Sequence, residues 1–145
     1  MAESEGSLRI VVADDNTFMA SSLKVLLELW GHSVTPVHDG RAALSLICEL
    51  RPDVALLDLR MPFLDGLEVA RRVRAEPDAG PVALIAVTGS ADPSDRLRTR
   101  AAGFDEHLVK PIDLQELRAL LRRPRSERAR SGGPAAFSVS RRPVV

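Results

Sequence analysis

The sequence predicts an α/β fold, a three-layer sandwich in which a parallel five-stranded sheet lies between two layers of helices. Five short apolar segments alternate along the chain with five segments of helical periodicity, an order typical of parallel strands joined by right-handed crossovers. The apolar segments are continuous rather than alternating, which indicates strands covered on both faces. The length of 145 residues suits one domain and a tail.

The five predicted strands are residues 8–13, 33–37, 53–59, 81–89 and 104–111. The first, LRIVVA, is a β-branched run of the kind that favours strands. The second, SVTPV, is weaker, and its Pro36 suits an edge strand because proline cannot donate a ladder hydrogen bond.

Helical spacing of apolar residues follows each strand. The first predicted helix begins after Asn16, a favourable N-cap, and ends at Gly31. The fourth, residues 93–103, has only Leu97, Ala101 and Ala102 to bury and is expected to be the loosest. The other four apolar stripes are Met19, Leu23, Leu26, Leu27 and Trp30; Ala43, Leu46, Ile47 and Leu50; Leu67, Ala70 and Val73; and Leu114, Leu117, Leu120 and Leu121, the last set capped by Asp113.

Composition excludes several classes of protein. No apolar run approaches the roughly 20 residues of a membrane span, and the first 15 residues lack the pattern of a secretory signal. Cys48 is the only cysteine, so it cannot form an internal disulfide, and we expect it to pack on the apolar face of its helix. These features predict a cytoplasmic protein.

The two ends of the chain differ from its middle. We predict that residues 8–123 form the folded domain, that residues 1–7 are disordered, and that residues 124–145 form a disordered Arg-, Ser-, Pro- and Gly-rich tail or linker. From Arg122 onward there are seven arginines and one acidic residue. Phe137 is the only aromatic residue in this segment, so stacking with nucleic acid bases is not favoured.

Polar residues stand where four of the predicted strands end: Asp14 and Asp15, Asp58, Thr88 and Lys110. The carboxyl ends of parallel strands lie at one edge of a sheet, where ligand sites form. Three neighbouring carboxylates repel one another, and Mg²⁺ would relieve this repulsion while leaving room for a phosphate. A carboxylate beside a lysine and a hydroxyl suits transfer of a phosphoryl group onto Asp58.

Each of these residues also has a plain structural interpretation. Asp14 and Asp15 could cap the first helix. Asp58 could be a solvated strand terminus, Thr88 an ordinary strand residue, and Lys110 a surface lysine. Their joint placement at one edge of the sheet favours the functional interpretation over these alternatives.

The segments VVADDN, LLDLRMPFLDG, AVTG and HLVKP, in this order and spacing, closely resemble the motifs of response-regulator receiver domains of two-component signalling. The resemblance extends from residue 8 to about residue 123. It implies a flavodoxin-like (βα)5 fold with strand order 2-1-3-4-5, as in the CheY-like superfamily, and Mg²⁺ as the cofactor.

The resemblance also implies roles for single residues. Asp58 would be the phosphoacceptor. Asp15 would bind Mg²⁺ directly, Asp14 would assist through water or share the metal, and the backbone carbonyl of Arg60 would be a further ligand. The side chain of Arg60 could reach over the phosphate.

The remaining implied roles concern the last two strands. Lys110 would contact the phosphoryl oxygens, and Pro111 would follow it through a cis peptide bond. Thr88 would be the switch hydroxyl. The second switch position usually holds Tyr or Phe in this family, whereas this chain has His107.

The primary functional hypothesis is a receiver that accepts a phosphoryl group from a sensor histidine kinase or histidine phosphotransfer protein. Its output surface would comprise residues 93–103, the fifth strand and the last helix, acting on an unknown protein. The domain would not be an enzyme beyond its own phosphorylation and dephosphorylation, and it would be a stand-alone receiver or a part of a larger chain.

The sequence leaves two alternative functions open. His107 and Arg60 motivate a binding module that works without phosphorylation. A flavin- or nucleotide-binding protein is disfavoured because ADDN, with its negative charge and no glycine, follows the first strand where a phosphate-binding loop would lie. Neither a membrane nor nucleic acid is an expected partner.

Overall fold

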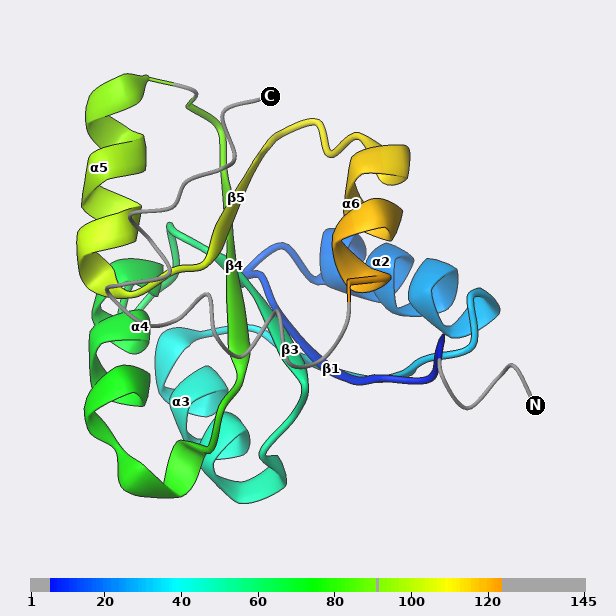
Figure 1. Cartoon of the computed structure of the whole chain (residues 1–145), viewed down its shortest axis with the longest axis horizontal. Helices are drawn as coiled ribbons and strands as arrows, with labels where there is room; N and C mark the ends of the chain where they lie inside the picture. Colours follow the sequence, from blue (N-terminus) through cyan, green and yellow to red (C-terminus); the bar gives the residue numbers. More distant parts are fainter. Residues whose placement is uncertain (1–5, 91, 124–145) are drawn as a thin grey trace.

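Five parallel strands form the centre of the protein (Figure 1). The computed structural model describes residues 6–90 and 92–123. The strands are β1 (Arg9–Ala13), β2 (Ser33–Val37), β3 (Val54–Asp58), β4 (Ala83–Thr88) and β5 (Glu106–Val109). Their order is β2-β1-β3-β4-β5 and every neighbouring pair is parallel. The predicted fold class and strand order are confirmed, although every strand except β2 is shorter than predicted.

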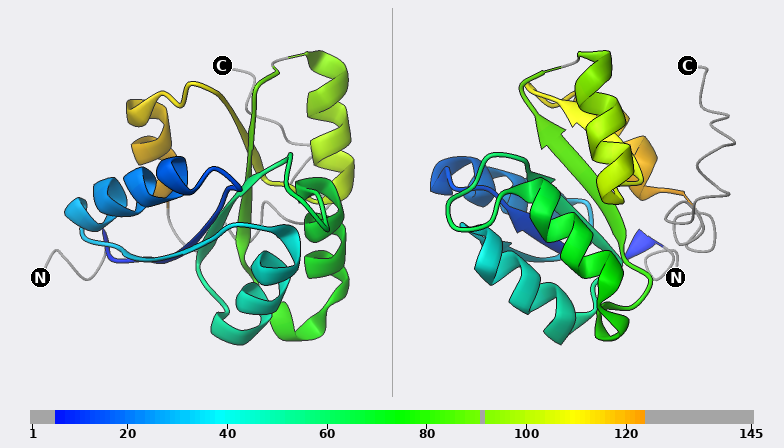
Figure 2. Two further views of the ribbon diagram at one scale, coloured as in Figure 1. Left: turned by 180° about the vertical axis from the view of Figure 1, so that it is seen from behind. Right: turned by 90° about the vertical axis from the view of Figure 1, so that its left-hand side faces the viewer.

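Two layers of helices cover the sheet. Helices α2 (Thr17–Leu29) and α6 (Leu114–Leu121) lie on one face, and α3 (Gly40–Leu50), α4 (Gly66–Ala75) and α5 (Pro93–Ala102) lie on the other (Figures 1 and 2). A short 3-10 turn, η1 (Pro77–Ala79), precedes β4. Each helix begins after an Asn or Asp whose side chain accepts a backbone N–H of the first turn: Asn16, Asp39, Asp65, Asp92 and Asp113. Such caps satisfy donors that the helix leaves unpaired.

The core is divided by the sheet because successive strand residues point to opposite faces. In β1, Val11 and Ala13 pack toward α3 and α4, whereas Ile10 and Val12 pack toward α2 and α6. All four side chains are buried. This two-sided burial explains why the strands read as continuous apolar segments.

Helix α5 corrects one prediction. The sequence predicts burial of Leu97 and Ala101, but Leu97 is 66% exposed and Ala101 is exposed as well. The buried residues of α5 are Thr99 and Ala102. Two faces of this helix carry equally little apolar surface, so periodicity alone could not select the face that packs.

The α2–α6 junction holds the only tryptophan of the chain. Trp30 caps the C-terminal end of α2 and packs against the core on that face. The guanidinium carbon of Arg118, in α6, lies 4.9 Å from its ring centroid, within the range of a cation–π contact.

A buried ion pair closes the amino edge of the sheet. Arg74 Nη2 lies 2.8 Å from Asp105 Oδ2, and the same carboxylate oxygen accepts the backbone N–H of Leu84 at 2.8 Å. Arg74 also donates to the carbonyl oxygens of Gly103 and Val82. The pair therefore joins the end of α4 to the starts of β4 and β5.

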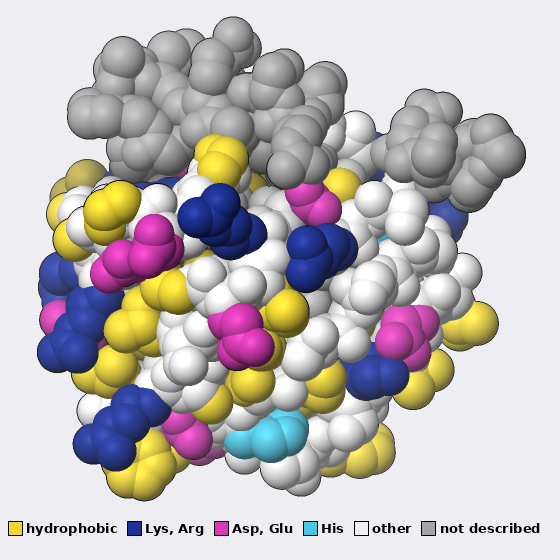
Figure 3. All heavy atoms as spheres, turned by 90° about the horizontal axis from the view of Figure 1, so that it is seen from below, with side chains coloured by type: hydrophobic (Ala, Val, Ile, Leu, Met, Phe, Trp, Pro, Cys, Tyr) yellow, Lys and Arg dark blue, Asp and Glu magenta, His cyan; other side chains and the backbone are white. Residues whose placement is uncertain are grey.

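The predicted disordered segments, 1–7 and 124–145, lie outside the described residues except for Gly6 and Ser7, which are exposed. Cys48 is half-buried and packs against the core, and burial raises the pKa of its thiol. Among the described residues, no helix has the length and apolarity to cross a membrane. On the face drawn in Figure 3, acidic and basic side chains are interspersed with apolar ones.

Candidate functional site

The three predicted carboxylates meet at the carboxyl edge of the sheet. Asp14 and Asp15 follow β1, and Asp58 is the last residue of β3, the strand paired with β1. Each offers a carboxylate oxygen, and these oxygens lie within 4.8 Å of one another. Asp14 and Asp58 are buried, whereas Asp15 is exposed. The cluster therefore has one side open to solvent.

Lys110 reaches this cluster from the far strand of the sheet. It follows β5, and its amide donates to the carbonyl of Thr88 at 2.7 Å. Lys110 Nζ lies 2.9 Å from Asp58 Oδ2 and 3.7 Å from Asp14 Oδ2. The Lys110–Pro111 peptide bond is cis, the form that the sequence resemblance implies.

The charges in the cluster do not balance. Burial raises the pKa of Asp14, the nearby Asp58 carboxylate adds to this effect, and the backbone N–H of Asn16 opposes it. Burial alone would lower the pKa of Lys110, but its hydrogen bond to Asp58 and the charges of Asp58 and Asp14 outweigh burial and raise it. One ammonium thus faces three carboxyl groups, which favours binding of a further cation.

Backbone groups fix the orientation of two carboxylates. The amide of Asn16 donates to Asp14 Oδ1 at 2.9 Å, and the amide of Arg60 donates to Asp58 Oδ1 at 3.0 Å. Gly66, at the start of α4, packs directly on the backbone of Asp58, where an added Cβ would lie 2.7 Å from the carbonyl oxygen. Any larger residue would have to displace β3 or α4.

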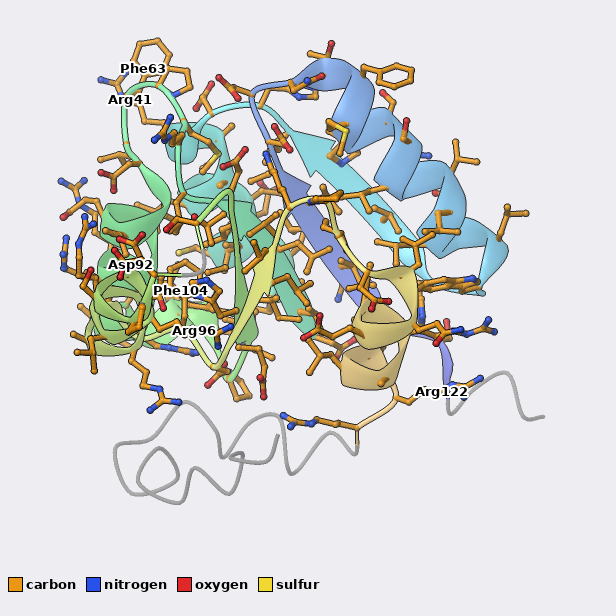
Figure 4. The ribbon with its side chains drawn as sticks, turned by 90° about the horizontal axis from the view of Figure 1, so that it is seen from above. Arg41, Phe63, Asp92, Arg96, Phe104 and Arg122 are labelled. Carbon is orange, nitrogen blue, oxygen red and sulfur yellow. The ribbon has the colours of Figure 1, made fainter. Side chains whose placement is uncertain are left out.

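The loop after β3 has a strained turn. Phe63 adopts a φ of 70°, and the amide of Leu64 donates to the carbonyl of Pro62 at 2.8 Å, which makes a γ-turn. The Phe63 ring is 72% exposed. The guanidinium carbon of Arg41 lies 5.1 Å from its centroid, and the two side chains lie side by side (Figure 4). The side chain of Arg60, in the same loop, is exposed.

The two predicted switch residues lie on neighbouring strands. Thr88 is buried at the end of β4, and its Oγ1 accepts the amide of Ser90 at 3.2 Å. His107, in the middle of β5, is half-buried. Its Nε2 lies 3.4 Å from the Ser90 carbonyl oxygen, and its Nδ1 lies 3.3 Å from Thr99 Oγ1.

Sequence reasoning did not find Ser90 or Thr99. Each hydroxyl residue lies in a segment where hydroxyls are common, a loop and a charged helix. No spacing motif connects either residue to His107, because the contact depends on how α5 packs on β5. In contrast, Asp14, Asp15, Asp58 and Lys110 could be found because parallel strands bring their ends together.

The donor set fits Mg²⁺. Magnesium prefers oxygen ligands and is usually bound by one or two carboxylates together with water. Asp14, Asp15 and Asp58 supply carboxylate oxygens within reach of one ion. The contribution of the Arg60 carbonyl stays a prediction.

A five-stranded parallel sheet with an acidic cluster and a lysine at its carboxyl edge defines the class of protein. Residues 10–122 match the response regulator receiver domain, and the chain belongs to this family of two-component signalling domains. These are signalling domains rather than conventional enzymes.

Two curated relatives are bacterial response regulators. The chain is 42% identical over 136 residues to response regulator MprA of Mycobacterium bovis strain BCG Pasteur 1173P2, an alignment covering 91% of this chain and 58% of the relative. It is 43% identical over 124 residues to MprA of Mycobacterium avium strain 104, covering 83% and 54%. The chain thus spans less than three fifths of the length of either relative.

Solved structures show the same fold. The receiver domain of sensor histidine kinase PA1611 from Pseudomonas aeruginosa PAO1, solved with a magnesium ion in its active site cleft, is 32% identical with a TM-score of 0.75, covering 83% of this chain and 98% of that chain. The chemotaxis response regulator CheY4 of Vibrio cholerae is 26% identical with a TM-score of 0.73, covering 79% and 95%.

Proposed function

We propose that this domain accepts a phosphoryl group on Asp58 from the phosphohistidine of a sensor histidine kinase or histidine phosphotransfer protein. The observation that carries the proposal is the surroundings of Asp58. Its carboxylate is buried at a strand end, lies 2.9 Å from Lys110 Nζ, and shares a cluster with Asp14 and Asp15.

The chemistry is a transfer between two residues. A carboxylate oxygen of Asp58 attacks phosphorus, the phosphorus–nitrogen bond of phosphohistidine breaks, and the electron pair leaves with the imidazole. The product on this chain is an acyl phosphate. Lys110 neutralises charge on the phosphoryl oxygens, and the amide of Arg60 keeps Asp58 oriented.

Mg²⁺ belongs to this proposal. Asp14, Asp15, Asp58 and the carbonyl of Arg60 would hold it, and when bound it would offset the negative charge of the phosphoryl oxygens. The excess of carboxyl groups over cations in the cluster supports this assignment. A relative's receiver domain with magnesium in its cleft supports it as well.

Phosphorylation would shift an equilibrium between two conformations. Thr88 would turn toward the phosphoryl group, His107 would repack, and the surface formed by α5, β5 and α6 would change its affinity for an output protein. Few residues of α5 are buried, which suits an element that moves at low cost. A cytoplasmic location is part of this proposal, since its donors act there.

The test is incubation with Mg²⁺ and acetyl phosphate, followed by intact-mass measurement. Wild-type protein should gain the mass of one phosphoryl group, and Asp58→Asn should gain none. Asp65→Asn is a matched control, because this exposed N-cap of α4 can be replaced by another good cap without touching the cluster. Equal phosphate on wild type and Asp58→Asn would refute the proposal.

The alternative function, a binding module that works without phosphorylation, has one specific observation in its favour. The position expected to hold Tyr or Phe is His107, a smaller and polar side chain. Under this alternative, Asp58→Asn would leave the affinity for an output protein unchanged, and beryllofluoride with Mg²⁺ would not alter the wild-type affinity.

A further inference from the structure

A chain of hydrogen bonds leads from the candidate site to α5. Thr88 Oγ1 accepts the amide of Ser90, and the Ser90 carbonyl oxygen lies 3.4 Å from His107 Nε2. The other ring nitrogen lies 3.3 Å from Thr99 Oγ1, and the Thr99 hydroxyl in turn reaches the carbonyl oxygen of Arg96 at 2.9 Å. The Thr88 hydroxyl is therefore connected to a buried residue of α5.

The protons in this chain can be counted. The carbonyl oxygens of Ser90 and Arg96 only accept, so His107 Nε2 must carry a proton to bond Ser90. If the ring is neutral, Nδ1 has none, and the single Thr99 proton can serve either Nδ1 or Arg96 but not both. If the ring is charged, Nδ1–H donates to Thr99 while the Thr99 proton stays on Arg96, and all three contacts are hydrogen bonds.

The hydrogen bonds favour the charged form of the His107 ring, whereas its burial favours the neutral form. Burial lowers the pKa of His107, and the bond to the Ser90 carbonyl works against this effect. The charged groups of α5 that act on the ring, Arg96 and Asp95, have opposing effects. The neighbouring strand β4 has no charged residue, and Asp105, two residues before His107, is held by an arginine of α4.

We propose that Thr99 is a positioning residue of the switch, whose hydroxyl holds the His107 imidazole against α5 and makes that attachment depend on the protonation of the ring. This inference rests on the proposed function only where it concerns the movement of Thr88. The hydrogen bond between Thr99 and His107 does not depend on phosphorylation.

The consequence for switching follows from the first bond of the chain. When Thr88 Oγ1 turns toward a phosphoryl group, it leaves the amide of Ser90, and the Ser90 carbonyl is no longer fixed from that side. The bond from His107 Nε2 to this carbonyl is then weakened, and the contact with Thr99 becomes the main attachment of the ring. When the His107 ring is neutral, the Thr99 proton that bonds Nδ1 is shared with the Arg96 carbonyl. When the ring is charged, Nδ1–H donates a charge-assisted hydrogen bond to Thr99, which is stronger. Release of α5 should therefore be easier at neutral pH than at acidic pH.

The experiment is a titration of the imidazole resonances by NMR in wild type, Thr99→Val and Thr99→Ser. Valine keeps the shape of threonine and lacks the acceptor, so the pKa of His107 should fall below its wild-type value. Serine keeps the hydroxyl and lacks the methyl group, so the pKa should return toward wild type. His32 and His38 take no part in these hydrogen bonds, so their resonances serve as internal references.

A purely structural role for Thr99 predicts the reverse, because valine would preserve packing and serine would not. An unchanged pKa of His107 in Thr99→Val, or equal values in Thr99→Val and Thr99→Ser, would overturn the proposal. The dispersion of amide resonances shows whether each variant is folded.

A second arm uses beryllofluoride with Mg²⁺ as a phosphoryl mimic. The His107 ring and the α5 amide resonances of wild type should shift on its addition, the α5 amides more at neutral than at acidic pH, and His107→Phe should abolish the pH dependence of the α5 amide shifts. If amides near Asp58 shift while the His107 ring does not, the chain from Thr88 to Thr99 is refuted. If beryllofluoride does not bind at all, the proposed function fails, and the comparison of the Thr99 variants still stands.

Discussion

The two edges of the sheet each bury a carboxylate against a cation, and they differ in charge balance. At the amino edge, Asp105 and Arg74 lie 2.8 Å apart and match one carboxylate with one cation, while Asp105 Oδ1 is buried without a hydrogen-bond partner among the described residues. At the carboxyl edge, Asp58 and Lys110 lie 2.9 Å apart, but Asp14 and Asp15 add two more carboxyl groups. The ion-pair distances alone would not distinguish these two places.

The surroundings of the cations explain the difference. Arg74 donates to the carbonyl oxygens of Val82 and Gly103 as well as to its carboxylate, so it is bound on several sides by the protein itself. Within the described part of the chain, the side-chain contacts of Lys110 Nζ are all with carboxylates, those of Asp58 and Asp14. A site for an external ligand is thus recognised by an unmatched excess of one charge, whereas a matched buried pair serves the fold.

Removal of Arg74 should produce the largest change in stability. Arg74→Met leaves Asp105 buried without its cation, and breaking such a pair costs about 3–5 kcal/mol of unfolding free energy. Urea denaturation at neutral pH measures this loss. Arg71→Met, on the exposed side of the same helix, should leave the unfolding free energy nearly unchanged. Similar losses in both variants would contradict the structural role of the pair.

The second largest effect is the pH dependence of the unfolding free energy that Asp105 causes at the amino edge. Burial raises the pKa of Asp105 to about 6 from its ordinary value of 3.8, although Arg74 opposes the shift. The folded state therefore binds this proton more tightly than the unfolded state. Its stabilising contribution is present below about pH 4 and is lost as the pH rises through about 6, by about 3 kcal/mol.

Denaturation of wild type and Asp105→Asn across pH 4 to 8 tests this sign. The difference in unfolding free energy, wild type minus variant, should fall between about pH 4 and pH 6 and stay level above that range. A difference that rises over the same interval would mean that the charge of Arg74 outweighs burial.

At the carboxyl edge, loss of one charge should raise the stability of the fold, whereas loss of Arg74 at the amino edge lowers it. Asp58→Asn removes one member of a repelling cluster, so without metal its melting temperature should rise, by about 2–6 °C for a gain near 1 kcal/mol. Addition of Mg²⁺ should stabilise wild type more than the variant and narrow the gap. Calorimetry with EDTA and with Mg²⁺ measures both effects. If the metal-free melting temperature of Asp58→Asn is lower than that of wild type, the carboxylates at the carboxyl edge do not repel one another as proposed.

The sequence predicted most of the fold because the strands are buried on both faces and therefore appear as continuous apolar runs. It predicted the cluster of Asp14, Asp15, Asp58 and Lys110 because parallel strands end at one edge. It did not predict the pairing of Arg74 with Asp105, which are 31 residues apart, nor the contact of Thr99 with His107. No spacing motif connects Arg74 with Asp105. The contact of Thr99 with His107 depends on how α5 packs, and periodicity does not define that packing for a helix with so little apolar surface.

The α2–α6 junction also makes this protein a convenient optical probe. The chain has a single Trp and no Tyr, so its ultraviolet-excited emission comes almost entirely from one indole, Trp30. The Arg118 guanidinium of α6 lies 4.9 Å from this ring, and a displacement of α6 would change the polarity and quenching that the indole experiences. Emission intensity therefore reports whether α6 stays docked on α2 in the native, unlabelled chain.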